Sequence, residues 1–278
     1  MLSNLIILKQ KKMILKPNIN NPKLTRKISG YDQEMKKISL DVVEEQPLTL
    51  FLNSQEIVTM MTINDYPEFL AVGYLLNQNM ISRNDEITSI EYEDEINVVV
   101  VRTKKKSNFE KKLKKKTITS GCAQGTVFGD IMEIFEKKKF KDNQKLKIEW
   151  IYELSKSITL TPSIYLKAGA IHGCVLCEKN TPLIYMEDVG RHNAIDKIAG
   201  YMFLNKINSN NKIFYTTGRL TSEMVIKSVI MEIPIVISRS GFTVWGVELA
   251  RKANLTLIGR AKGKKFTLLS GEKRVENK

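Results

Sequence analysis

The sequence predicts an α/β protein with a mainly parallel sheet covered by helices on both faces, preceded by a smaller N-terminal α+β domain. The first observation is an alternation of elements. Residues 212–218, 234–238 and 255–259 have the pattern of strands, and residues 222–231 and 242–253 between them have the pattern of helices. This β-α-β-α-β order implies crossover connections and parallel strands. The second observation is length, because 278 residues with 42% hydrophobic content can form one large domain or two smaller ones.

Residues 1–117 divide into two segments of different character. Residues 1–37 are polar and basic without sustained periodicity, so we expect a flexible extension. Residues 38–117 have the pattern of a small α+β domain. Two strands flank a turn at Asn53 and Ser54, and Pro67 opens a helix with apolar residues at helical spacing. Two more strand patterns follow before a lysine-rich stretch.

The main α/β domain is expected to span residues 118–278, and it begins with the segment that carries Cys122. Residues 118–126 are small and punctuated by glycines, which indicates a mobile loop, and a helix is predicted over residues 127–138. Nearby lysines and a following helix N-terminus favour the thiolate form of a cysteine and so make it a better nucleophile. Cys122 is therefore the candidate catalytic residue, and an incidental exposed thiol is the alternative.

The other two cysteines, Cys174 and Cys177, lie in the first strand of a hairpin predicted over residues 172–186. Residues three positions apart in a strand point to opposite faces of the sheet, so we expect these thiols to diverge and to be buried. A zinc site would have to recruit His172 and Cys122 from elsewhere. We expect no metal site, and a zinc-dependent hydrolase that uses this His and Cys cluster stays as an alternative.

Ligands of an open α/β sheet bind beyond the carboxyl ends of its parallel strands. The residues that follow the three predicted strands combine glycine, hydroxyl and cationic side chains, which suit the oxygens of a phosphorylated ligand. The predicted anion-binding residues are Gly218, Arg219, Ser238, Arg239, Arg260, Ala261, Lys262, Gly263, Lys264 and Lys265.

Residues 187–197 add a further candidate. This segment follows a predicted strand and opens a helix, with Asp188 as the expected N-cap. Arg191 and His192 are then predicted to project from the first helical turn, where the positive end of the helix adds to their charge. We expect both residues to contribute to anion binding, and an ordinary core or surface histidine is the alternative for His192.

Composition limits the classes of function. The formal net charge of +14 suits a polyanionic partner, but lysine is abundant along the whole chain, so a solvated basic surface explains the charge as well. A basic nucleic-acid-binding module stays as an alternative, although aromatic residues do not alternate with the lysine runs. No apolar run approaches the roughly 20 residues that cross a membrane, and no signal peptide is recognisable. We therefore expect a cytoplasmic protein with reduced thiols.

Five short stretches, taken in order, resemble the FdhD family of formate dehydrogenase accessory sulfurtransferases, over about residues 45 to 269. The most specific stretch reads E-D-V-G-R-H-N-A-I-D-K. All five are residues 45–48, 120–122, 168–172, 187–197 and 254–259.

The resemblance implies a cytidine-deaminase-like core and a role as a sulfur carrier. Cys122 matches the family's persulfide-bearing cysteine, which takes sulfur from a cysteine desulfurase. The acceptor is a molybdenum or tungsten bis-pterin guanine dinucleotide cofactor, sulfurated before its insertion into the catalytic subunit of formate dehydrogenase. Residues 260–265 match the family's cofactor-binding segment. The cofactor is a bound substrate, no permanently bound metal is implied, and a homodimer is expected.

This sequence lacks two motifs that related proteins carry, and each absence limits the expected mechanism. Many family members carry a second cysteine three positions after the first, whereas this chain has Gly125 there, so a single-thiol relay is expected. The zinc deaminase signature is also absent, because Gly173 and Cys174 follow His172 and no proline precedes the later cysteines. Deamination is therefore not implied by a deaminase-like core.

Overall fold

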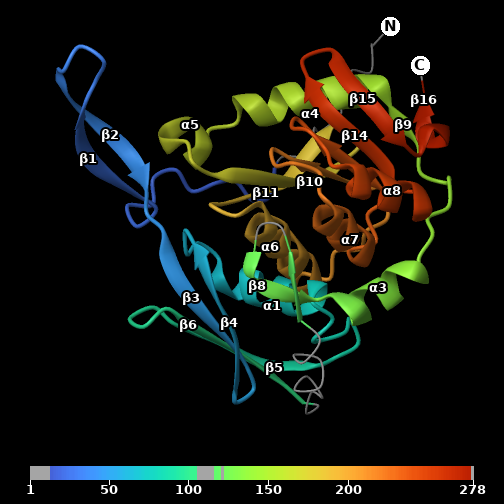
Figure 1. The fold of residues 1–278 in the computed structure, drawn as a ribbon, viewed down its shortest axis with the longest axis horizontal. Helices are drawn as coiled ribbons and strands as arrows, with labels where there is room; N and C mark the ends of the chain where they lie inside the picture. Colours follow the sequence, from blue (N-terminus) through green and yellow to red (C-terminus); the bar gives the residue numbers. More distant parts are fainter. Residues whose placement is uncertain (1–12, 105–115, 120–121, 277–278) are drawn as a thin grey trace, which may run out of the picture.

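A six-stranded sheet forms the centre of the computed structural model, which describes residues 13–104, 116–119 and 122–276 (Figure 1). The strand order across the sheet is β11-β10-β12-β13-β14-β15. The strands are β10 (His172–Glu178), β11 (Thr181–Asp188), β12 (Lys212–Thr216), β13 (Ile235–Ser238), β14 (Thr256–Lys262) and β15 (Lys265–Ser270).

The central sheet is mixed, so the expectation of a mainly parallel sheet is wrong. Only β12, β13 and β14 are parallel neighbours, and the other three pairings are antiparallel. The reason is that both edges of the sheet are hairpins. Short turns at residues 179–180 and 263–264 join β10 to β11 and β14 to β15, and a tight turn can only join antiparallel strands. The cytidine-deaminase-like core stays a prediction.

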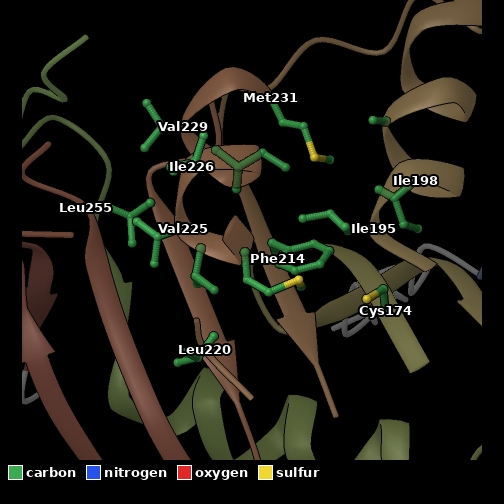
Figure 2. Packing of buried hydrophobic residues seen from close by; sticks show 14 of the residues in the cluster. Cys174, Ile195, Ile198, Phe214, Leu220, Val225, Ile226, Val229, Met231 and Leu255 are labelled. Atoms are coloured by element: carbon green, nitrogen blue, oxygen red, sulfur yellow. The ribbon is translucent and has the colours of Figure 1, made fainter. Parts of the chain in front are cut away.

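Helices cover both faces of this sheet. Side chains alternate between the two faces along each strand, and both faces carry apolar side chains that a helix layer removes from water. On one face Phe214 and neighbouring side chains pack against α6 (Arg191–Leu204), α7 (Ser222–Ile230) and α8 (Val244–Lys252). Figure 2 shows Phe214 between Ile195 of α6 and Val225 of α7. On the other face Tyr215 and its neighbours pack against α4 (Ile148–Leu160). The two faces therefore have separate apolar cores.

A second sheet with strand order β4-β3-β6-β5 forms the N-terminal part of the molecule. Its helix α1 (Pro67–Asn77) packs along α6 of the central body. The hairpin turn at Asn53 and Ser54 and the helix opened by Pro67 are as predicted. The strands of this sheet are β3 (Gln46–Leu52), β4 (Gln55–Thr62), β5 (Ile87–Glu93) and β6 (Val98–Thr103).

Strand structure begins earlier than the sequence pattern indicates. β1 (Thr25–Tyr31) lies within residues 1–37, where we expected a flexible extension, and it pairs with β2 (Lys37–Val43) in a hairpin that projects from the body (Figure 1). Pairing with β2 explains the difference, because a short strand needs a partner rather than local periodicity to form. Residues 1–12 of the expected extension lie outside the described residues. The division into domains stays a prediction.

The segment around Cys122 is a hairpin rather than a loop. β7 (Lys116–Thr119) pairs with β8 (Cys122–Val127), and Thr119 lies opposite Cys122. The β-branched residues of this segment favour strands over a loop. Residues 120–121 of the predicted loop lie outside the described residues. The predicted helix follows as α3 (Phe128–Glu136).

Short elements complete the described chain. None of its helices combines the length and apolar character that a membrane crossing needs. The remaining elements are β9 (Leu146–Lys147), α5 (Ile164–Ala168), a 3-10 turn (Glu272–Arg274) and β16 (Val275–Glu276).

Candidate functional site

The carboxyl edge of the three parallel strands gathers most of the predicted anion-binding residues. Thr216 pairs with Ser238, and Ile237 pairs with Ile258, so β12 and β13 end level with the middle of β14, which continues to Lys262. β10 runs antiparallel to β12, which places its first residue, His172, at the same edge. We call this edge the rim, and define it by His172, Arg191, Gly218, Arg219, Ser238, Arg239 and Arg260.

Hydrogen bonds between the rim loops hold their backbones in place. The Ser238 hydroxyl donates to the carbonyl of Gly218 at 2.6 Å, and the backbone N–H of Arg239 donates to the carbonyl of Thr216 at 3.2 Å. Gly218 allows close packing, because a Cβ there would lie 2.9 Å from Cβ of Arg191. The rim loops are therefore ordered by contacts with one another.

Two rim arginines lie over aromatic rings. The guanidinium carbon of Arg239 is 5.8 Å from the ring centre of Tyr165, and that of Arg260 is 5.3 Å from the ring centre of Phe242. Such stacking orients a guanidinium group and leaves its N–H donors available to a carboxylate or phosphate. Arg219 and Arg260 are exposed and Arg239 is half-buried, so all three raise the positive potential at this edge.

Residues 260–265 have a different structure from the loop that we expected. They form the end of β14, a turn at Gly263 and Lys264, and the start of β15. A bulge changes the register after Gly259, and Arg260 adopts a left-handed conformation with a φ of 54°. Ala261 is then buried beneath α4 and is 1% exposed, so its side chain does not face a ligand. Lys262, Lys264 and Lys265 are exposed at the end of the hairpin.

Arg191 and His192 begin α6 as predicted but do not project into solvent, because α7 and the loop at Gly218 cover the first turn. Each is 7% exposed. His192 Nε2 lies 3.2 Å from a carboxylate oxygen of Glu223 in α7. Burial lowers the pKa of His192 to about 2, with Lys227 and Arg191 acting in the same direction, so the imidazole is neutral.

The expected N-cap, Asp188, has another role. Gly190 occupies the N-cap position of α6, and the Asp188 carboxylate lies 2.6 Å from the ammonium group of Lys197. It also accepts a hydrogen bond at 2.5 Å from Thr62 in β4. Lys197 contacts Asp65 as well and is fully buried. This cluster joins the N-terminal sheet to the central body.

Sequence reasoning missed the Lys197 cluster and a second buried pair beside it. Asp196 lies 2.6 Å from the ammonium group of Lys227, and it accepts a hydrogen bond at 2.7 Å from the amide of Asn77 in α1. The sequence does indicate that these two charged residues are buried, because Asp196 and Lys197 lie in a helix with apolar neighbours on both sides. Their partners could not be identified, since Asp65 and Asn77 are more than a hundred residues away in sequence.

Glu187 positions Tyr165, the aromatic residue that lies against Arg239 of the rim. Its carboxylate accepts hydrogen bonds from the backbone N–H groups of Ile164 at 2.7 Å and Tyr165 at 3.1 Å. These bonds hold the start of α5, which carries the ring beneath Arg239. Burial raises the pKa of Glu187 to about 7, against the opposing effect of the two backbone hydrogen bonds.

Cys174 and Cys177 face opposite sides of the sheet, which confirms the predicted divergence. Cys174 packs with Phe214 on one face and Cys177 with Tyr215 on the other. Both are fully buried, and burial raises the pKa of Cys174 to about 12 and that of Cys177 further. Neither thiol is available for nucleophilic chemistry near neutral pH.

Three comparisons relate the chain to known proteins. The model of the FdhD/NarQ family matches residues 43–276. The sulfur carrier protein FdhD of Wolinella succinogenes is 30% identical over 236 residues, which cover 84% of this chain and 82% of that protein. FdhD of Bacillus subtilis is 29% identical over 259 residues, covering 92% of this chain and 99% of that protein.

A solved structure is similar along almost the whole chain. It is the crystal structure of a protein from Desulfotalea psychrophila that is assigned as a formate dehydrogenase accessory protein. The TM-score is 0.73 and the sequence identity is 26%. The match covers 91% of this chain and 98% of that chain.

Proposed function

The chain belongs to the FdhD/NarQ family, and from this premise we propose that it is a sulfur carrier that serves formate dehydrogenase. Relatives that align with most of this chain bear the name sulfur carrier protein FdhD. The role needs a thiol that accepts sulfur and a surface that binds the molecule receiving it.

Burial of two of the three cysteines is the observation that carries the proposal. Cys174 and Cys177 are enclosed in the two apolar cores with raised pKa values. The remaining cysteine, Cys122, begins β8 and is joined through this strand directly to α3. Cys122 is therefore the residue proposed to carry sulfur as a persulfide.

The proposed first transfer is a thiol exchange. The Cys122 thiolate attacks the outer sulfur of a persulfide on a cysteine desulfurase, the S–S bond of that persulfide breaks, and the desulfurase cysteine leaves as a thiolate. The product is a persulfide on Cys122. No net oxidation occurs, because one S–S bond forms as another breaks.

The proposed second transfer delivers sulfur to the metal of a bis-pterin guanine dinucleotide cofactor, which is the substrate. The outer sulfur of the persulfide leaves as sulfide, the metal in its reduced state supplies the two electrons, and Cys122 returns to the thiolate. The sulfurated cofactor is then available to the catalytic subunit of formate dehydrogenase. One thiol is sufficient for this cycle, which agrees with Gly125 in place of a second local cysteine.

The rim is the proposed binding surface for that cofactor. The cofactor carries pyrophosphate groups, and Arg219, Arg239 and Arg260 present guanidinium groups that suit phosphate oxygens. Lys262 and Lys264 extend the positive surface beyond the sheet edge. Arg191 and His192 are proposed to support the rim from beneath, since both are buried.

Mass spectrometry tests the role of Cys122. After incubation with a cysteine desulfurase and cysteine, we expect an adduct of about 32 Da on the peptide that contains Cys122. The Cys122→Ser variant should lose this adduct, and Cys174→Ala should keep it because that thiol is buried. An adduct that survives Cys122→Ser would contradict the proposal.

A further inference from the structure

A cavity of about 560 Å³ lies far from the rim. α6 begins at the rim with Arg191 and α7 begins near it with Ser222, whereas the cavity is lined by the C-terminal ends of both helices. The ends of α1 and α3, the segments that follow the four helices, and Ile87 of β5 also line it. Its volume is within the range of pockets that bind small molecules.

Most of the cavity wall is apolar. Leu76 comes from α1, Ile134 from α3, Met202 and Phe203 from α6, and Ile230 from α7. The wall therefore combines the N-terminal α+β part with the central body. A ligand with an apolar or aromatic body would remove this surface from water.

One buried polar group in the wall lacks a partner. Asn77 is 1% exposed, and its Nδ2 donates to a carboxylate oxygen of Asp196 at 2.7 Å. A carboxylate held by Lys227 at 2.6 Å can only accept, so the orientation of the Asn77 amide is determined. Its Oδ1 accepts no hydrogen bond within the described part of the chain. A buried acceptor without a partner is unfavourable, and a ligand N–H or O–H group would satisfy it once the neighbouring side chains of the wall move aside, because the oxygen itself is enclosed.

The polar residues around the cavity have a net positive charge. Among the described residues that line it, Arg83, Lys138 and Lys206 are cationic and Glu232 is the one acid. Glu232 lies 2.7 Å from Lys138 and 3.1 Å from Arg83, so this one carboxylate is shared by two cations. Lys206 is exposed. An anionic group on the ligand is therefore favoured near Lys206.

We propose that this cavity is a second binding site, separate from the rim, for a small anion with an aromatic or apolar body and one hydrogen-bond donor. The apolar wall takes the body, Asn77 Oδ1 accepts from the donor, and the excess of cations takes the negative group. The proposal does not depend on sulfur transfer, because none of these residues belongs to the rim or to the segment of Cys122.

The dye 8-anilinonaphthalene-1-sulfonate is a suitable probe, since it combines aromatic rings, one N–H group and one sulfonate. Titration of the full chain should give saturable binding of one dye per chain, followed by fluorescence. Lys206→Gln should weaken binding about fivefold, because it removes one positive charge beside the sulfonate. Lys156→Gln is the matched control, since Lys156 is exposed on α4 at the opposite face of the central sheet and should leave binding unchanged.

A second variant tests the location of the dye. Ala199 lines the cavity on α6, and Ala199→Phe should occupy the space and abolish dye binding, while an unchanged thermal unfolding midpoint shows that the chain still folds. The proposal would be overturned if the wild type bound no dye. Dye binding that is retained in folded Ala199→Phe would also overturn it, because the dye would then lie outside the cavity. Dye binding that is weakened by Arg260→Gln and not by Lys206→Gln would overturn it too, and would place the dye at the rim.

Discussion

At the scale of single residues, the segment 187–197 is notable for the charges that it buries. Lys197 is fully buried between the carboxylates of Asp65 and Asp188. Burial lowers the pKa of Lys197, but these two acids outweigh it and raise the pKa, so the ammonium group stays charged. His192 in the same segment is kept neutral. Lys197 connects the N-terminal sheet to the central body, and His192 packs against Glu223 of α7.

Replacement of Lys197 by Met should be strongly destabilising. It leaves two buried carboxylates without their cation, which costs about 3–5 kcal/mol in the free energy of unfolding, measured by urea denaturation. Lys104→Met is the matched control, because Lys104 pairs with Glu86 on the exposed surface and should change stability by less than about 1 kcal/mol. Similar small losses in both variants would show that the buried cluster contributes little.

The neutral state of His192 should appear in the pH dependence of stability. Its pKa is lowered in the folded state, so the unfolded chain binds the proton more readily, and acidification below about pH 6.5 favours unfolding. Between pH 7 and pH 5 the wild type should lose about 2 kcal/mol from this residue, and His192→Gln should lack that loss.

The variant isolates this contribution because Glu187 is present in both proteins. The raised pKa of Glu187 acts in the opposite sense, since stability from that group falls as pH rises from about 4.5 to about 7. The measurement is therefore the difference between wild type and His192→Gln in unfolding free energy at each pH. A difference that does not change with pH would contradict a neutral buried His192.

At the scale of elements, the contact between α1 and α6 joins the two parts of the molecule. The helices cross where Gly73 faces Gly200, and the two backbones are in direct contact. A Cβ on Gly73 would lie 1.7 Å from the carbonyl oxygen of Asp196, and one on Gly200 would lie 1.9 Å from that of Phe69. The polar bridge from Asn77 to Asp196 lies on the same pair of helices.

Gly73→Ala should therefore force the helices apart. We expect a loss of about 2 kcal/mol or more, because overpacking against rigid backbone exceeds the gain in helix propensity of about 1 kcal/mol. Gly30→Ala is the control, since a Cβ at Gly30 in β1 meets nothing within 4 Å. Thermal or urea unfolding of both variants provides the comparison, and equal stability would show that α1 and α6 separate easily.

At the scale of the whole molecule, the parallel strands and the helices between them place different chemistry at their two ends. The rim at the carboxyl ends carries arginines stacked on aromatic rings. The opposite ends of α6 and α7 line the apolar cavity. The basic residues behind the formal charge of +14 are spread over the whole chain, so charge alone does not distinguish the rim. The rim differs from other basic surface in its hydrogen-bonded loop backbones and in the guanidinium groups that aromatic rings orient.

A guanine nucleotide should distinguish the rim from general basic surface. We expect GDP to bind the wild type, and Arg260→Gln to weaken binding about tenfold or more, because a hydrogen bond to a charged group contributes about 1.5–3 kcal/mol. Arg26→Gln is the matched control on the projecting hairpin, where Arg26 pairs with Glu44. Isothermal titration calorimetry measures both, and equal weakening by the two variants would assign binding to net charge alone.

Local patterns in the sequence were sufficient to locate most helices and strands of the central body, including the order from β12 to β14. They also identified the rim loops and the opposite orientation of Cys174 and Cys177. The alternation of strands and helices shows where each parallel strand ends. Gly218, Ser238 and Arg239 could therefore be assigned to the carboxyl ends of the parallel strands from their places in the chain. The hairpin of Cys122 was missed, because Gly121 and Gly125 indicated a loop and outweighed the β-branched residues around them, whereas the pairing of β7 with β8 appears only in the structure.

The sequence by itself determined the α/β class, the alternation that creates the rim and the family resemblance, because these depend on residues that are close together in the chain. The tertiary structure alone decided that the sheet is mixed, that Arg191 and His192 are buried, and that Lys197 meets Asp65. It also revealed that Asn77 Oδ1, enclosed in the cavity wall, accepts no hydrogen bond from the described residues. Each of these depends on contacts between distant segments, whose energies arise only when the chain is packed.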